Sequence, residues 1–223
     1  YALRRQALGA LRILLEKQIP LDLEAAIAAA LGNYQERLKL EAQAQRRVAA
    51  ELRDFIWARA QGLFEEQGFR IDEIRSVREG GLRRLPGTYL RLNAVHRMRQ
   101  NPEFEPLAAV FKRAANILRQ AAQRREAVPE GGPQRADLKE PAELALLDAL
   151  ESVRGEMEEH LAAARFEECL RSVVNLKPLL DAFFDKVMVM ADDPVLKAAR
   201  LALLARLVRL IRQVADLAEI QGP

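Results

Sequence analysis

Apolar residues recur three or four positions apart along most of this chain, which is the spacing that gives an α-helix one buried face. The first stripe precedes Pro20 and consists of Leu3, Leu8, Leu11, Leu14 and Leu15. The same spacing predicts further helices over residues 22–31, 34–67, 71–78, 88–99, 102–126 and 140–161, and from residue 166 to a break near 176–178. No segment reads convincingly as a strand, so we expect an all-α fold.

Glycine, proline and threonine positions set the expected ends of several helices. Gly32 is expected to stop the second helix, and Thr88 is expected to cap the helix that runs to Arg99. Two prolines and two glycines within residues 128–139 exclude a continuous helix, so this stretch is predicted to be a loop. Pro141 suits the first turn of the helix that follows, where its missing N–H costs no hydrogen bond.

A boundary near residue 100 divides the chain into two predicted domains. Residues 1–99 form a helical body domain that ends in a basic loop and helix. Residues 100–223 form a helical bundle with the 128–139 loop as an internal excursion. The length of 223 residues allows one large domain or two small ones, so this division agrees with the size of the chain.

The run from Asp181 to Leu204 predicts a helical hairpin: an apolar helix, an acidic break at Asp192–Asp193–Pro194, and a second apolar helix. An ion pair between Arg200 and Asp185, or alternatively Asp181, would set the register of the two helices. The expected core residues of the first helix are Phe183, Phe184, Val187, Met188 and Met190.

Composition excludes several classes of protein. Ala, Leu, Arg and Glu dominate and all favour helices, while no run approaches the roughly 18 apolar residues of a membrane span. Two histidines and one cysteine are too few for a zinc site, and the Gly–Gly pairs lack the Lys-Ser/Thr of a phosphate loop. We expect no catalytic residue and no metal ligand in this chain. Because the chain starts at Tyr1 inside a helical pattern and carries no secretory signal, it is expected to be a piece of a longer protein or a trimmed chain.

Positive and negative charge are segregated along the chain, although the net charge is only +3. Residues 70–99 hold eight basic and three acidic residues, a net +5, and residues 195–212 hold five basic and no acidic residues. Residues 137–168 hold three basic and ten acidic residues, a net −7. Such segregation indicates either a surface that binds a polyanion or a solvated surface that is merely patchy, and charge alone leaves both open.

Two predicted helices carry a basic face opposite an apolar one. In the helix over residues 102–126, Lys112, Asn116 and Arg119 form a single stripe with Arg113 beside it. In the last helix, Arg206, Arg209 and Arg212 lie opposite the leucines. Lys and Arg hold phosphates, and Asn and Arg also read base edges. The alternative for each helix is an ordinary amphipathic helix with a polar outer face.

Three stretches resemble the C-terminal region of the bacterial-type glycyl-tRNA synthetase beta subunit. They are FFDKVMVMADDPVLKAARLALL near the C-terminus, FKRAANIL upstream of it, and YALRRQALGALRILLE at the start. The resemblance extends from Tyr1 to Gln221. From about residue 100 onward the chain is also similar to the all-helical anticodon-binding domain shared more distantly with arginyl-tRNA synthetases.

The resemblance implies a tRNA-binding part of glycine–tRNA ligase without an active site of its own. In that family the beta subunit captures tRNA(Gly), including its anticodon region, while glycine activation, with its ATP and Mg²⁺, belongs to the alpha subunit. The two subunits form a heterotetramer, in the bacterial cytoplasm or alternatively in a plant organelle, and no membrane is involved. The K-R-x-x-N element makes Lys112, Arg113 and Asn116 the first RNA-facing candidates. Charge and helical position add Arg97, Arg99 and Arg119.

A second function remains open. The weak net charge and the Ala/Leu-rich helices also suit a protein-interaction scaffold that holds the alpha subunit or another partner without touching RNA.

Overall fold

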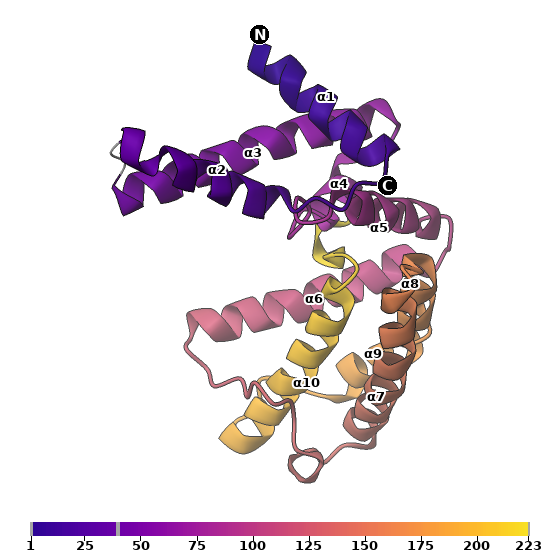
Figure 1. Cartoon of the computed structure of the whole chain (residues 1–223). Helices are drawn as coiled ribbons and strands as arrows, with labels where there is room; N and C mark the ends of the chain where they lie inside the picture. The colour runs from indigo at the N-terminus through magenta and orange to yellow at the C-terminus, as the bar shows by residue number, and fades with distance from the viewer. Residues whose placement is uncertain (1, 39–40, 223) are drawn as a thin grey trace. The chain divides into compact units, whose positions relative to one another are not determined.

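Every regular element of the structure is helical in the residues that it describes, which confirms the predicted all-α fold (Figure 1). The computed structural model describes residues 2–38 and 41–222. The chain folds into two compact units, Tyr1–Asn93 and Ala94–Pro223.

The first unit is built around α3, which α1, α2 and α4 contact. Its helices are α1 (Ala2–Glu16), α2 (Leu23–Leu38), α3 (Ala42–Glu66), α4 (Ile71–Ser76) and most of α5 (Leu85–Met98). Aromatic rings fill its centre: Phe64 stacks on Tyr89 with ring centroids 6.0 Å apart, while Phe69 and Trp57 meet Phe64 edge-on. These contacts tie α3 to α5 because Phe64 and Tyr89 belong to different helices.

Gly32 does not stop the second helix, contrary to the prediction. Helix α2 continues through it to Leu38, and α3 begins only at Ala42. A glycine inside a helix lowers the stability of the helix by only about 1 kcal/mol relative to alanine. The alanines in the turns before Gly32 favour the helix and offset this loss. The expected single helix over 34–67 is therefore two helices, and its positions 39–40 lie outside the described residues.

Thr88 is not a helix cap either. Helix α5 begins at Leu85, so Thr88 lies inside its first turns, with only 1% of its surface exposed. Its hydroxyl donates a hydrogen bond to the Gly81 carbonyl at 2.9 Å. Pro86 lies in the first turn of α5 instead, where a proline removes no helical hydrogen bond.

The second unit packs its helices around α10. The elements are α6 (Phe104–Gln123), the short 3-10 helix η1 (Arg135–Asp137), α7 (Pro141–Ala162), α8 (Phe166–Val174), α9 (Lys177–Lys186), α10 (Pro194–Arg212) and the 3-10 helix η2 (Leu217–Glu219). Helix α10 contacts α6 and α7, and Figure 1 shows it crossing α6. Ten of its residues are buried, which marks it as the central helix of this unit. The predicted 128–139 loop is confirmed apart from η1.

In the hairpin of residues 181–204, the connector between the two helices differs from the prediction. Helix α9 ends at Lys186, and Val187 is extended, with φ −117° and ψ 117°. Neighbouring side chains in extended backbone point to opposite sides, so Val187 and Val189 are buried while Met188 between them is 75% exposed. Met188 is therefore not a core residue, and Met190 is only half-buried. The predicted core positions Phe183, Phe184 and Val187 are confirmed.

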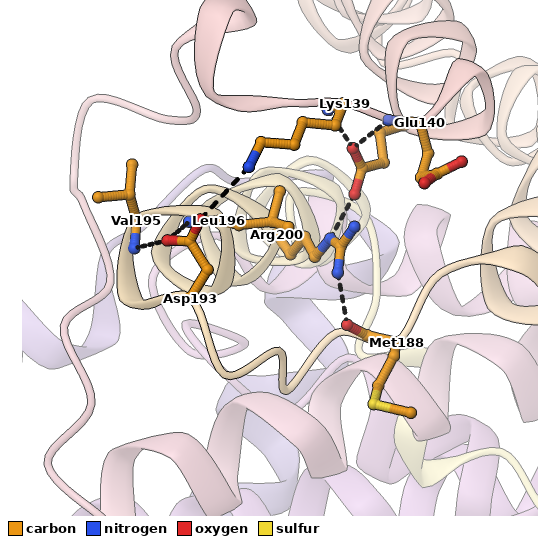
Figure 2. A network of polar contacts seen from close by, with 8 residues as sticks. Lys139, Glu140, Met188, Asp193, Val195, Leu196 and Arg200 are labelled. Atoms are coloured by element: carbon orange, nitrogen blue, oxygen red, sulfur yellow. Dashed lines mark hydrogen bonds and ion pairs between the residues drawn. The ribbon is translucent and has the colours of Figure 1, made fainter.

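Arg200 pairs with Glu143 of α7 and not with Asp185 or Asp181, which corrects the predicted clamp. Its Nη1 also donates to the Met188 carbonyl at 2.8 Å, and Figure 2 shows the Arg200 side chain reaching this carbonyl from α10. Asp181 accepts from Lys177 of its own helix at 2.6 Å. The arginine meets Glu143 because α10 packs against α7.

Candidate nucleic-acid interface

Helix α6 has the two faces that its sequence predicted. Lys112, Arg113 and Arg119 are exposed, and Asn116 is half-buried beside them. The opposite face of the helix is buried in the unit through Leu107, Ala108, Phe111, Ala114 and Ala121. The cationic side chains therefore belong to a surface that the fold supports rigidly from behind.

Two of these side chains have defined positions. Arg119 donates from Nη2 to the side-chain oxygen of Asn116 at 3.0 Å. The guanidinium of Arg113 lies over the ring of Phe184, 4.4 Å from its centroid, so the cation is held by α9 while it stays exposed. Lys112 is exposed and makes no ion pair with the described residues, which leaves its ammonium available to a phosphate.

The three arginines of α10 that were predicted to face RNA are placed differently from one another. Arg206 is directed to α7, where it pairs with Glu151 at 3.1 Å. Arg212 pairs with Asp216 at 2.9 Å. Arg209 is exposed and has no ion-pair partner among residues 2–38 and 41–222. The three residues share one side of a helical wheel, but the packing of α10 between α6 and α7 gives each a separate environment.

A groove of about 410 Å³ lies between α6, the end of α10 and η2. It brings together predicted residues of both helices, Asn116 and Arg119 from α6 and Arg212 from α10. Lys112, Arg113, Arg206 and Arg209 do not line it. Two acidic residues that the sequence did not suggest, Asp216 and Glu219, complete its polar lining, and its apolar lining consists of Ala115, Leu118, Val208 and Ala218.

Of the two acidic groove residues that the sequence analysis missed, only Asp216 had a recognisable sequence pattern. Arg212 and Asp216 are four positions apart, which is the spacing of a helical ion pair. Asp216 also accepts the backbone N–H of Ala218 at 3.1 Å and so starts η2. Glu219 carried no such signal, because only the return of the chain along α6 brings it to the groove.

Arg97 and Arg99 lie near the start of the second unit, on and just after α5. Arg97 pairs with Glu167 of α8 at 3.5 Å. Arg99 donates from Nη2 to the Gln221 carbonyl at 2.6 Å, close to the C-terminus. The structure does not place either of them in the groove.

Within residues 2–38 and 41–222, no three His, Cys, Asp or Glu side chains gather as metal ligands would. In the same part of the chain, no helix has both the length and the apolar character that crossing a bilayer requires.

Two family models match the chain. The one described as "Glycyl-tRNA synthetase beta subunit" matches residues 1–79, and the one described as "DALR anticodon binding domain" matches residues 107–223. The second match contains α6 from Leu107 onward, α10, η2 and the groove between them.

Similar proteins carry the name glycine–tRNA ligase beta subunit. The protein of Delftia acidovorans is 39% identical over 220 residues, which is 99% of this chain and 30% of that protein. Those of Acinetobacter baylyi and Sodalis glossinidius are each 38% identical, over 222 and 221 residues. The chain spans about three tenths of the length of these curated relatives. It belongs to the glycyl-tRNA synthetase beta subunit family and carries the DALR anticodon binding domain in residues 107–223.

Proposed function

We propose that this chain is a tRNA-binding portion of a glycyl-tRNA synthetase beta subunit, and that it recognises tRNA(Gly), including its anticodon region. The observation that supports this most directly is the match of residues 107–223 to an anticodon-binding domain. The same residues contain the exposed cations of α6, and cations on a rigid helix face are what holds RNA phosphates in place.

The reaction that this binding would serve is glycylation of the tRNA by the alpha subunit, with which the full-length beta subunit would form a heterotetramer in the bacterial cytoplasm. The alpha subunit would supply the site for ATP and Mg²⁺. The role of this chain is then to bind and orient the tRNA. Lys112 would pair with a phosphate of the tRNA, and Asn116 and Arg119 would form hydrogen bonds with it.

The test is a titration of the 223-residue chain with labelled tRNA(Gly), read by fluorescence anisotropy at several salt concentrations. An unrelated tRNA and a tRNA(Gly) with a replaced anticodon serve as matched competitors. We expect tighter binding of tRNA(Gly), a loss on anticodon replacement, and weaker binding as salt rises, because each phosphate contact releases counterions. Equal affinity for all three RNAs would refute specific recognition.

The scaffold alternative predicts a different pair of results. A chain that serves only assembly would retain the alpha subunit in a pull-down and would fail to bind tRNA at any salt concentration.

A further inference from the structure

Another groove of the second unit lies between the 128–139 loop and the first turns of α10, and we call it the proline groove. Its volume is about 520 Å³, and its lining is mostly apolar. The α10 side consists of Pro194, Val195 and two alanines, and the loop side consists of two prolines, two glycines, Gln134 and Asp137. None of these residues lines the groove between α6, α10 and η2, so the two grooves are separate surfaces.

The sequence builds the proline groove from small and rigid residues. Val195, Ala198 and Ala199 follow the i, i+3, i+4 spacing of one helix face, and the two alanines leave the space that larger side chains would fill. On the opposite side the prolines fix the backbone, and Gly132 turns the loop with φ +88°, which other residues rarely adopt. The groove is therefore formed before any partner binds.

The cations around the proline groove are all engaged in ion pairs. Residues 126–139 and 192–199 contain three lysine or arginine residues, and each pairs with a carboxylate of the same unit. The pairs are Lys197 with Glu126 at 2.8 Å, Lys139 with Asp193 at 3.3 Å, and Arg135 with Asp148 of α7. Figure 2 shows Lys139 reaching Asp193 at the start of α10. These pairs tie the loop to α10 and α7 and leave no free cation of the two segments for a phosphate.

Three carboxylates of the same two segments keep their charge unpaired. Glu130 and Asp192 are exposed, Asp137 is half-buried in the groove lining, and none of them forms an ion pair with the described residues. Glu130 lies next to the lining residue Pro129 in the chain, and Asp192 lies two positions before Pro194. Unpaired carboxylates beside an apolar groove repel phosphates and attract cations. The proline groove therefore suits an apolar side chain that is flanked by lysine or arginine.

We propose that the proline groove is a docking site for a basic peptide segment of a partner protein. The segment places an apolar side chain against Val195 and the alanines of α10, and a lysine or arginine beside Asp137. The volume of about 520 Å³ allows this, since ligand pockets start at roughly 300 Å³. The inference goes beyond the proposed RNA binding, because it assigns a protein partner to a surface whose unpaired charge is opposite to that of the exposed Lys112 and Arg113.

A library of random dodecapeptides displayed on phage, selected against the immobilised 223-residue chain, tests this proposal. We expect the retained peptides to combine an apolar residue with an excess of lysine and arginine. A retained peptide is then synthesised with a fluorescent label, and its affinity is measured by anisotropy. The affinity should fall as salt rises, and by about threefold in Asp137→Asn, which is the range of a partly exposed ion pair. Ala198→Trp fills the groove and should weaken binding at least about tenfold, as loss of a central interface contact does.

Asp185→Asn and Ala145→Trp are the matched controls, because they make the same changes at exposed positions of the second unit outside the groove. Both should bind the peptide as the unmodified chain does, and circular dichroism should show every variant equally folded. If Ala198→Trp does not fold, Asp137→Asn against Asp185→Asn decides alone.

Three results would overturn the docking site. The selection could retain no peptide or only peptides without an excess of lysine and arginine, or the groove variants could bind as tightly as their controls. Displacement of the labelled peptide by a random-sequence RNA oligonucleotide would assign the groove to nucleic acid instead. The first two results leave the titration of the chain with tRNA(Gly) unaffected, so they are distinguishable from a failure of the proposed function.

Discussion

Arg200 of α10 and Glu143 of α7 form an ion pair in the interior of the second unit, where the Glu143 side chain is fully buried. The same carboxylate accepts the backbone N–H groups of Lys139 and Glu140, at 2.7 and 2.8 Å, and so caps α7. Arg200 also holds the Met188 carbonyl in the connector between α9 and α10. One pair of side chains thereby joins the start of α7, the connector and the central helix.

Replacing Arg200 with methionine should therefore destabilise the second unit strongly. The change leaves Glu143 buried without its cation, and loss of one partner of a buried pair costs about 3–5 kcal/mol in the free energy of unfolding. Urea denaturation followed by circular dichroism measures this loss. Arg154→Met is the matched control, because Arg154 pairs with Glu158 on the surface and its loss should cost less than about 1 kcal/mol. Equal losses in the two variants would contradict a structural role for the buried pair.

Gly81→Ala should destabilise the first unit by about 1–3 kcal/mol through overpacking. A Cβ at this position would lie 2.5 Å from a ring carbon of buried Trp57 and 3.0 Å from the Arg78 carbonyl. Trp57 is the single tryptophan of the chain, so its fluorescence during urea unfolding reports this unit directly. Gly155→Ala provides a control of opposite sign: Gly155 lies in α7 with open space around it, and alanine there should stabilise the helix by up to about 1 kcal/mol.

Thr88→Val should lower the stability of the same unit by about 1–3 kcal/mol, because the valine keeps the shape and leaves the Gly81 carbonyl without its donor. Thr88→Ser separates the two contributions of the threonine, since serine retains the hydroxyl and loses only the methyl group. Trp57 fluorescence again follows the transition. If valine were tolerated better than serine, packing and not the hydrogen bond would hold this turn together.

Acid should weaken the start of α10. The backbone N–H of Leu196, then the Lys139 side chain and the N–H of Val195, hold the pKa of Asp193 below its usual value. A carboxylate with a lowered pKa in the folded state stabilises that state above its unfolded pKa, and this stabilisation is lost as pH falls below about 4. Hydrogen exchange of the first turn of α10, measured between neutral pH and pH 3, should show this opening.

Asp193→Asn is the control for that pH dependence. Asparagine is also a good N-cap but does not titrate, so the acid-induced increase in exchange at the first turn of α10 should shrink in this variant. An unchanged pH response would assign the effect to other carboxylates.

Lys112→Ala and Asn116→Ala should weaken tRNA(Gly) binding in different ways. Loss of a phosphate contact at Lys112 should reduce the slope of log affinity against log salt by about 0.7–0.9. Loss of Asn116 should leave that slope nearly unchanged and reduce the difference between tRNA(Gly) and its anticodon-replaced form. Arg154→Ala, which removes one positive charge from α7, serves as the control in the same titrations. Negligible effects of both α6 variants would exclude this helix face from the interface.

The two faces of α6 could be predicted from the sequence because an amphipathic stripe is a local property: the spacing of Leu107, Phe111 and Ala114 determines which side is buried. The end of α9 could not be predicted in this way. The residues after Lys186 are as apolar as those before it, and the extended connector is held by a hydrogen bond from Arg200, which lies 12 positions after Met188.

The candidate site shows the same limit. Asn116, Arg119 and Arg212 could be proposed from charge and helical position, but nothing local joins them to one groove or adds Glu219. Asp185 was an equally reasonable partner for Arg200 by spacing, yet Glu143 is the partner because α7 packs beside α10.

The sequence by itself determined that the fold is all-α, most of the buried positions on its helices, and the family to which the chain belongs. These properties depend on spacing and residue type within a few turns. The tertiary structure alone decided which charged groups meet, because contacts between helices depend on packing of the whole unit. The Arg200–Glu143 pair and the groove with Glu219 are both products of that packing.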